Sequence, residues 1–347
     1  MDYNFHGGEI EVDIKYDFSV NNNPLGMPSY VEKAISKNVA LYSKYPDRKC
    51  CDLKEAIASY ELTETNQIVC GNGASELIMA ISASMSKDKE INALIMSPTF
   101  SGYERAIKTY GGKVSYYQSY NELYKLLDNN KSEEEKFNFL FICNPNNPTG
   151  EVIENSELKN IIDAARRSEV LTVVDECFIN FTHEKSVVDL IDDYDNLVVL
   201  KAFTKFYSMA GIRLGYICSN KKVCEAVEQF LPEWNVSTIA QAAGISAIND
   251  KEKVRNWNSK TLKTIDTERK YLSEELTKIG FELSDSKANY ILCKSNCCDL
   301  YNRLLDLGIL VRDCSNFNEL NSSYIRICVS THERNKVLID AIQKIMS

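Results

Sequence analysis

Between residues 91 and 219 the sequence contains five short apolar runs that are separated by amphipathic stretches. The runs are INALIM from residue 91, FNFLFIC from 137, VLTVVD from 170, LVVLKAF from 197 and YICS from 216. Strands that are apolar on both faces belong in a parallel sheet that is covered by helices on both sides. We therefore predict an α/β fold, with a mostly parallel sheet and helices on both of its faces.

The segments between the runs carry helix signals. Residues 75–85 follow a Gly-Asn-Gly turn, residues 103–110 end at two glycines, and residues 157–167 follow an Asn-Ser pair. Glycine after a helix and a small polar residue before one are typical boundaries. These short helices are expected to connect the strands of the sheet.

The pattern changes at about residue 250, where one long charged helix over 250–279 precedes shorter strand and helix segments. A chain of 347 residues is long enough for a large domain and a smaller one. We expect an N-terminal arm that is also part of the small domain over 1–40, a large domain over 41–249, and a small α+β domain over 250–347.

Charge and cysteine content exclude several classes of protein. The net charge is −9, and the basic residues are scattered among acidic ones, so we expect no nucleic-acid or membrane-surface partner. No apolar stretch reaches the roughly 18 residues of a membrane span, and the first residues do not resemble a signal peptide. A cytoplasmic location is therefore expected. The 12 cysteines are spread through a large chain, which favours free thiols, and their densest group, Cys293, Cys297 and Cys298, lacks C-x-x-C spacing, so we expect no metal site.

Polar residues follow several of the apolar runs, where α/β sheets bind their ligands. They are Asn147 in NPNNPTG, Asp175 after VLTVV, and Thr204 and Lys205 after LVVLKAF; Gly73 begins a helix nearby in sequence. Singly, these are ordinary turn, cap and surface residues. Together they supply an amine for an imine, a carboxylate for a ring nitrogen, a donor for a ring hydroxyl and an anion cradle, which suits a phosphorylated pyridine aldehyde.

The motifs GNGASE, PTFSGY, CNPNNPTG, VDECF and FTKFYSMAGIRLGY occur in this order, and with them the chain resembles the fold-type I pyridoxal-phosphate enzymes of the class I/II aminotransferase group. The resemblance implies two catalytic residues, Lys205 as the amine that binds the cofactor and Asp175 as the partner of its ring nitrogen. It implies a homodimer with shared active sites. The further cofactor-binding residues that it implies are Asn147 at the ring hydroxyl, Phe100 stacked on the ring, Gly73, Ala74, Ser75, Thr204 and Arg213 at the phosphate, and Tyr45 reaching the phosphate from the partner subunit.

A narrower resemblance extends over nearly the whole chain. The segments FHGGEI, YDFSVNNNPLGMP, KYPD, DECFINF, GILVRDCSNF and YIRICVSTHERN resemble the threonine-phosphate decarboxylases of cobalamin synthesis, whose nearest sister family is the histidinol-phosphate aminotransferases. Phe178 favours the decarboxylases, because the aminotransferases more often have tyrosine there. The resemblance implies that the substrate is gripped by His6, Gly7, Asn21, Asn147, Arg312 and Arg326.

The expected reaction is decarboxylation of L-threonine O-3-phosphate to (R)-1-aminopropan-2-yl phosphate. Amino transfer from histidinol phosphate to 2-oxoglutarate is the alternative, and the sequence leaves the choice open. Ala202 replaces a common phosphate-binding serine, and Glu9 replaces a common asparagine, so the match is incomplete. A non-catalytic cofactor-binding domain is a distant alternative, because no basic helix-turn-helix region accompanies the motifs.

Overall fold

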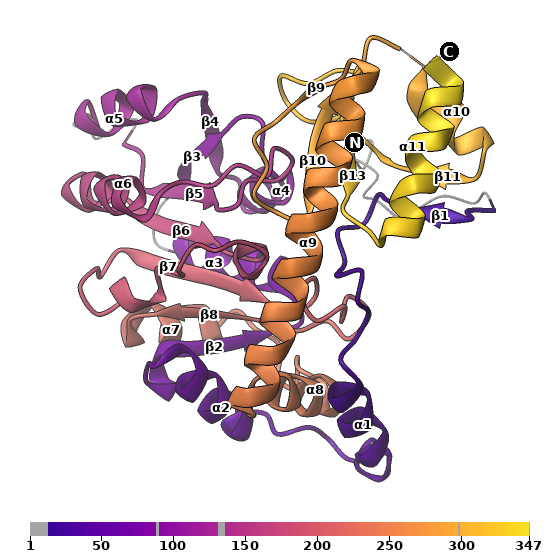
Figure 1. Ribbon diagram of the computed structural model, residues 1–347. Coiled ribbons are helices and arrows are strands. Elements are labelled where there is room, and N and C mark those ends of the chain that lie inside the picture. Colours follow the sequence, from indigo (N-terminus) through magenta and orange to yellow (C-terminus); the bar gives the residue numbers. More distant parts are fainter. Residues whose placement is uncertain (1–12, 88–89, 131–135, 298, 347) are drawn as a thin grey trace.

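The computed structural model describes residues 13–87, 90–130, 136–297 and 299–346. A seven-stranded sheet forms the centre of these residues, and a smaller sheet lies beyond the carboxyl ends of its parallel strands (Figure 1). The central strands are β2 (Ile68–Gly71), β3 (Asn92–Met96), β4 (Lys113–Tyr117), β5 (Phe139–Cys143), β6 (Leu171–Asp175), β7 (Leu197–Ala202) and β8 (Gly215–Ser219).

The strand order of the central sheet is β2-β8-β7-β6-β5-β3-β4. The pairs from β7 through β6, β5 and β3 to β4 are parallel, whereas β8 is antiparallel to both of its neighbours. The prediction of a mostly parallel sheet is therefore confirmed, with YICS as the one reversed strand among the five predicted runs.

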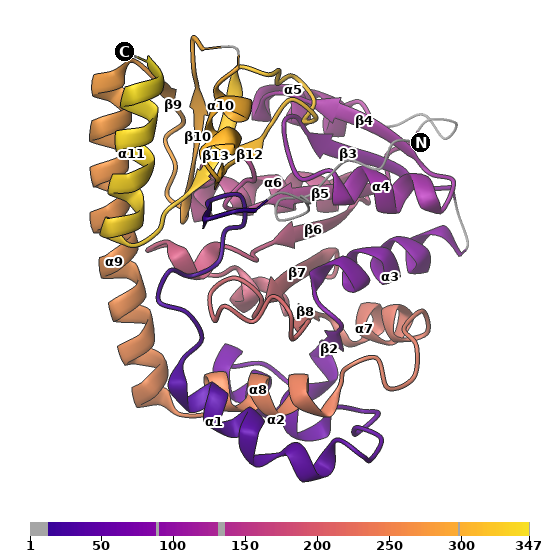
Figure 2. The same ribbon diagram turned by 90° about the vertical axis from the view of Figure 1, so that its right-hand side faces the viewer.

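Helices cover both faces of this sheet, because its strands are apolar on both sides. Along β5, Phe139 and Phe141 pack in one hydrophobic cluster, and Leu140 and Ile142 pack in another on the opposite face. The first face carries α3 (Ala74–Ser86), α4 (Gly102–Thr109) and α7 (Lys221–Glu228), which Figure 2 shows on one side of the sheet. The second face carries α2 (Cys51–Glu61), α5 (Tyr120–Asp128), α6 (Asn155–Arg167), α8 (Thr238–Ile248) and α9 (Lys251–Ile279).

The long helix α9 runs from the central sheet to the smaller one (Figure 1). Asp250 caps its start by accepting from two backbone N–H groups, and Gly280 ends it with a left-handed φ of 102°. The expected domain boundary at residue 250 coincides with this cap and stays a prediction. The elements beyond α9 are β9 (Glu282–Leu283), β10 (Tyr290–Lys294), α10 (Leu300–Asp306), β11 (Ile309–Leu310), β12 (Arg312–Asp313), β13 (Tyr324–Cys328) and α11 (His332–Met346).

The smaller sheet is antiparallel, in the order β12-β13-β10-β9. The N-terminal segment contacts both parts of the molecule: β1 (Tyr16–Asp17) pairs with β11, and α1 (Ser29–Lys37) lies beside α8 (Figure 2). Short 3-10 helices occupy Val39–Leu41, Thr65–Gln67, Ile179–Phe181 and Val188–Leu190. In the part of the chain that is described, no helix is long and apolar enough to cross a membrane.

Candidate active site

The predicted site residues lie at or just after the carboxyl ends of three neighbouring strands of the central sheet, β5, β6 and β7. Cys143 at the end of β5 is in register with Asp175, the last residue of β6, and Asp175 is in register with Leu200 in β7. Asn147 and Lys205 lie in the loops that follow β5 and β7. Because the three strands are parallel, their carboxyl ends open on the same side of the sheet.

Lys205 lies in a turn whose backbone is held from two directions. Its carbonyl oxygen accepts from the N–H groups of Ser208 at 3.2 Å and Asn23 at 3.0 Å. Burial lowers the pKa of the Lys205 amine to about 8, and the positive charges of Arg326 and Arg213 act in the same direction. An amine with such a pKa is neutral often enough near pH 7 to attack a carbonyl carbon.

Asp175 is a buried carboxylate with one donor on each oxygen. The backbone N–H of Cys177 donates to Oδ1 at 2.9 Å, and the hydroxyl of Tyr103 donates to Oδ2 at 2.7 Å. Burial raises the pKa of Asp175, while the hydrogen bonds from Cys177 and Tyr103 oppose that rise. The site therefore holds a fixed carboxyl group where a protonated ring nitrogen could pair with it.

Arg326 joins the smaller sheet to the loop after β5. One of its Nη groups donates to Oδ1 of Asn147, and the other donates to the carbonyl of Ser19 at 2.8 Å. Its Nε is buried and has no hydrogen-bond partner among the described residues. Arg312 is its register partner across β12 and β13, and donates to Oδ1 of Asn316 at 2.9 Å. Two permanently charged guanidinium groups thus occupy neighbouring positions beside the site.

The start of α3 forms a cradle of backbone N–H groups. Gly73 is its N-cap residue, with a φ of 82° and no side-chain cap, and Ala74 and Ser75 begin the first turn. The guanidinium of Arg213 packs over Gly73 so closely that a Cβ at position 73 would lie 2.3 Å from its Nη2. Uncapped N–H groups beside a guanidinium favour an anion. Thr204, which is buried, follows β7 on the same edge of the sheet.

Two aromatic residues that were predicted at the cofactor have different surroundings. Phe100 follows β3, and its ring meets the ring of Tyr103 edge-on, with 5.4 Å between centroids. Tyr45 is 82% exposed and contacts Trp234 with 4.8 Å between ring centroids. Within a single described chain, therefore, Tyr45 lies at the surface.

The predicted substrate residues are only partly described. Asn21 is buried, its carbonyl accepts from Nδ2 of Asn289 at 2.8 Å, and its Oδ1 has no partner among the described residues. His6 and Gly7 lie outside the described residues.

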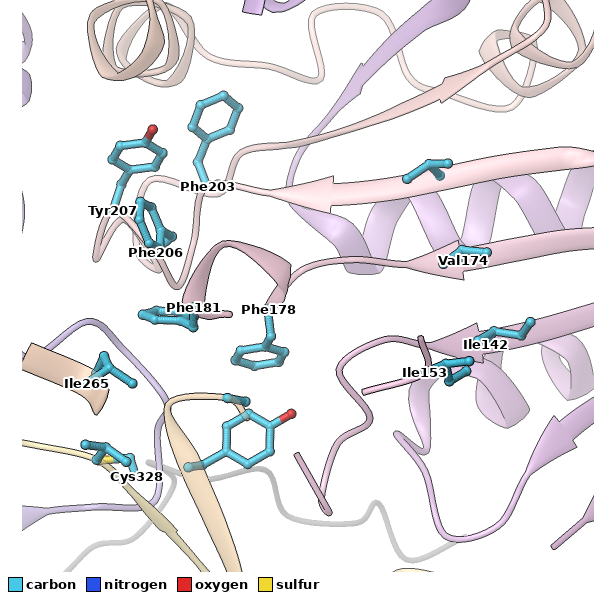
Figure 3. Packing of buried hydrophobic residues seen from close by; sticks show 14 of the residues in the cluster. Ile142, Ile153, Val174, Phe178, Phe181, Phe203, Phe206, Tyr207, Ile265 and Cys328 are labelled. Atoms are coloured by element: carbon cyan, nitrogen blue, oxygen red, sulfur yellow. The ribbon is translucent and has the colours of Figure 1, made fainter. Parts of the chain in front are cut away.

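Aromatic rings fill the space between the ends of β6 and β7 and the smaller sheet. Figure 3 shows Phe178, Phe181 and Phe206 beyond the end of the strand that carries Val174. Phe178 meets Tyr290 of β10 edge-on at 5.0 Å, and Phe181 meets Phe206 at 5.2 Å between centroids. This packing fixes the smaller sheet, and with it Arg326, against the central sheet.

Several residues of the site were not predicted from the sequence. Tyr103 lies within the PTFSGY motif, but the motif does not indicate that its hydroxyl contacts Asp175. Asn289 is fully buried beside Asn21 and has no motif of its own. Ser19 contacts Arg326 through its carbonyl oxygen, a contact that any residue type could make.

The site has the groups that pyridoxal phosphate requires. It combines a lysine amine of lowered pKa, a buried carboxylate, and an uncapped helix start at Gly73, which packs against Arg213. Among the described residues, no cluster of His, Cys, Asp or Glu side chains could hold a metal ion. The eleven described cysteines are free thiols.

Comparison with known proteins gives relatives in two groups. A protein of Caldanaerobacter subterraneus subsp. tengcongensis with the provisional name threonine-phosphate decarboxylase is 36% identical, over 97% of this chain and 93% of that protein. The threonine-phosphate decarboxylase of Salmonella typhimurium is 31% identical, over 99% and 96%. The crystal structure of the histidinol-phosphate aminotransferase from Clostridium acetobutylicum is 31% identical, with a TM-score of 0.86, and covers 95% of this chain and 99% of its own.

The family profile described as aminotransferase class I and II matches residues 13–342. It covers the central sheet, α9 and almost all of the smaller C-terminal part. The fold is that of the fold-type I group, to which the solved structure also belongs. The chain therefore belongs to the class I and II aminotransferases, a family that depends on pyridoxal phosphate.

Proposed function

We propose that this chain decarboxylates a phosphorylated amino acid, L-threonine O-3-phosphate, to (R)-1-aminopropan-2-yl phosphate in cobalamin biosynthesis. The bond between Cα and the carboxylate breaks, CO2 leaves, and a proton takes its place on Cα. The observation that carries the proposal is the pair of arginines, Arg312 and Arg326, in register on adjacent strands, with Arg326 close enough to Lys205 to lower the pKa of its amine.

In this proposal the residues that would hold pyridoxal phosphate are those that the family resemblance implies. Pyridoxal phosphate, when bound, supplies an electron sink for the electron pair that is left on Cα. Asp175 would hold the ring nitrogen, and Asn147 would donate to the ring hydroxyl. Phe100 would lie against the ring. The phosphate would be held by the N–H groups of Gly73, Ala74 and Ser75, by Thr204 and by Arg213.

The two arginines would decide which bond of the substrate breaks. Arg326 has a free Nε, and its Nη groups are already fixed by Asn147 and Ser19, so it presents a donor in a constant position. If the substrate phosphate binds to Arg312 and Arg326, these arginines would not hold the carboxylate, which would be left free to leave as CO2. Each charged hydrogen bond to the phosphate contributes roughly 1.5–3 kcal/mol. Asn21, with His6 and Gly7, completes the substrate site in this proposal.

Lys205 is the proton donor to Cα in the proposed reaction. Its buried amine is close enough to Arg326, at the proposed substrate site, to feel that charge, and it would hold the proton that Cα receives. With a pKa of about 8, it is mostly protonated at pH 7 and can release that proton readily.

A histidinol-phosphate aminotransferase is the second candidate function. The observation that favours it is the solved structure from Clostridium acetobutylicum, which matches this chain at the same 31% identity as the Salmonella typhimurium decarboxylase. Phe178 favours the decarboxylase, because it offers no hydroxyl at a position where the aminotransferases more often have tyrosine.

The two reactions differ in their need for an amino acceptor. The protein loaded with pyridoxal phosphate is given O-phosphothreonine alone, and CO2 is measured. In a parallel reaction it is given histidinol phosphate with 2-oxoglutarate, and glutamate is measured. We expect CO2 without any keto acid; glutamate formation without CO2 release would overturn the proposal. O-phosphoserine is the control for the methyl group, which is worth about 1–3 kcal/mol in a pocket.

We also propose a homodimer with shared active sites. Tyr45 and Trp234 form an exposed aromatic pair, and Val39 and Leu41, close to Tyr45 in sequence, are exposed as well. In this proposal Tyr45 reaches the cofactor phosphate of the second copy. Sedimentation of the wild type and of Tyr45→Ala, with cofactor affinity measured on the same samples, tests it: a fully active monomer would contradict the proposal.

A further inference from the structure

Tyr103 is one of two residues that donate a hydrogen bond to the Asp175 side chain. It lies in the first turn of α4 and is completely buried. Its hydroxyl donates to Oδ2 of Asp175 at 2.7 Å, a bond that spans 72 positions in the sequence. A buried tyrosine hydroxyl normally finds such a partner, so the bond alone does not separate a packing role from a functional one.

The ring of Tyr103 is held on two sides by other aromatic rings. It stacks on Phe141 of β5 with 4.6 Å between centroids and an interplanar angle of 13°. Phe100 meets it edge-on, at 85°. The ring of Phe100 in turn lies against Gly102, where a Cβ would come within 2.3 Å of Cε1. The hydroxyl of Tyr103 is therefore fixed relative to Asp175 and to the residue that we assign to the face of the cofactor.

The charge on Asp175 depends on its hydrogen-bond donors. Burial raises its pKa, and the bonds from Cys177 and Tyr103 counteract that rise. The other titratable groups that face Asp175 are Cys143 of β5 and Tyr290 of β10. Burial raises the pKa of Cys143 to about 12 and raises the pKa values of Tyr103, Cys177 and Tyr290, so all four are neutral between pH 6 and 9. Asp175 is therefore the one member of this group whose charge depends on the balance between burial, which raises its pKa, and its hydrogen bonds, which lower it.

We infer that Tyr103 is a positioning residue for the cofactor: its hydroxyl orients Asp175 and keeps it anionic, so that it can hold the protonated ring nitrogen. This inference rests on the proposed role of Asp175. Tyr103 does not touch the reacting atoms and acts only through the carboxylate. Without the hydroxyl, Asp175 loses one of its two donors and binds a proton more readily. A neutral carboxyl group pairs weakly with a protonated ring nitrogen.

The test is cofactor affinity of the apo protein, measured by quenching of protein fluorescence between pH 6 and 9. For Tyr103→Phe we expect pyridoxal phosphate to bind about tenfold more weakly at pH 7, as for loss of one charged hydrogen bond. The ratio of the variant and wild-type dissociation constants should grow as the pH falls, because Asp175 becomes neutral at a higher pH in the variant. Titration of Lys205 and of the cofactor changes both dissociation constants by the same factor, so it cancels in this ratio.

The decisive probe is 1-deazapyridoxal 5′-phosphate, in which CH replaces the ring nitrogen. Tyr103→Phe and the wild type should bind this analogue equally, whereas a merely structural role would weaken both ligands alike and overturn the inference. Tyr117→Phe is the matched control, because its hydroxyl is also buried at the sheet but has no partner among the described residues. It should leave both affinities unchanged.

A second measurement does not depend on the analogue. In an Asp175→Asn background, Tyr103→Phe should have no further effect on the affinity for pyridoxal phosphate. An equal loss in both backgrounds would overturn the inference, even if Tyr103→Phe lowers stability. A wild-type protein that binds no pyridoxal phosphate would instead contradict the proposed function.

Discussion

Two buried lysines, Lys201 in β7 and Lys205 in the loop that follows it, have opposite electrostatic surroundings. The reactive lysine site consists of Lys205 and Asp175, and the closed ionic cluster consists of Lys201, Glu176 and Glu61. Asp175 and Glu176 are neighbours at the end of β6 and point to opposite faces of the sheet. Both lysines belong to the segment that begins with β7.

In the closed ionic cluster, the Nζ of Lys201 lies 2.9 Å from Glu61 and 3.8 Å from Glu176, and all three side chains are buried. Burial acts to lower the pKa of Lys201, but the charges of Glu61 and Glu176 outweigh it and raise that pKa. Among the residues that are described, no carboxylate forms an ion pair with Lys205, and arginines are its charged neighbours. The comparison teaches that neighbouring charges, rather than burial, decide which lysine is a structural cation and which is a nucleophile.

The largest effect is expected for Lys205→Ala. Without the amine, turnover should fall by roughly 10³-fold or more, because the covalent step is lost. Borohydride should fix the cofactor on wild-type protein, and mass spectrometry should find it on the peptide of Lys205. Lys205→Arg, which keeps the charge but cannot react, is the control. Finding the cofactor on Lys201 would show that Lys201, and not Lys205, is the reactive lysine.

Lys201→Met should have the largest effect on stability. It leaves two glutamates buried without their cation, which costs about 3–5 kcal/mol of unfolding free energy. Urea unfolding of the apo protein measures this cost. Lys205→Met is the matched variant and should not destabilise: because folding lowers the pKa of Lys205, the charged amine is a cost below about pH 8 that is relieved as the pH rises. Equal losses in both variants would contradict the distinction.

The pH dependence of cofactor uptake tests the amine of Lys205 directly. The apo protein should take up pyridoxal phosphate with a rate that rises about tenfold per pH unit and levels off near pH 8, where the amine becomes neutral. Arg326→Gln removes the neighbouring charge and should move this midpoint to higher pH. Stopped-flow absorbance provides the measurement. A midpoint above pH 10 in the wild type would show an ordinary surface lysine.

Glu176→Gln should have the smallest effect, within about 1 kcal/mol of wild type at pH 7, because Lys201 keeps its closer partner Glu61. Burial raises the pKa of Glu176, so wild-type stability decreases as the pH rises above the ordinary value of 4.5 and Glu176 ionises. The variant lacks this titration, and its stability should improve relative to wild type with rising pH. Urea midpoints across that range measure it. A constant difference would show that Glu176 does not titrate in this way.

Apolar runs were sufficient to predict the interior of the central sheet but not its edges. β4 at one edge has a single fully buried residue, Tyr117, and β2 at the other edge has only four residues. The reversal of β8 is not visible in YICS itself. The signal lies in residues 203–214, which contain no crossover helix of the kind that a parallel connection requires.

In the candidate site, likewise, residues within local motifs could be predicted from the sequence, whereas their partners from distant segments could not. Lys205 and Asp175 were found because each follows a strand within a motif. The partners that set their properties could not be read from spacing: Glu61 reaches the closed ionic cluster from α2, and Arg326 reaches Lys205 from the smaller sheet. Tyr103 lies within the PTFSGY motif, but its contact with Asp175 forms only when α4 packs on the folded sheet.

The segment from Ser19 to Asn23 has a consequence for how the protein is made. Ser19 accepts from Arg326 across 307 positions of the chain, and Asn23 donates to Phe206 and Thr261 across 183 and 238 positions. Contacts of such long range form late in folding. On the ribosome, Lys205 emerges long before Arg326. The nascent chain therefore has the amine before it has the positive charge that helps to lower the pKa of that amine. Tight and correctly oriented cofactor capture is therefore a property of the finished chain rather than of the growing one.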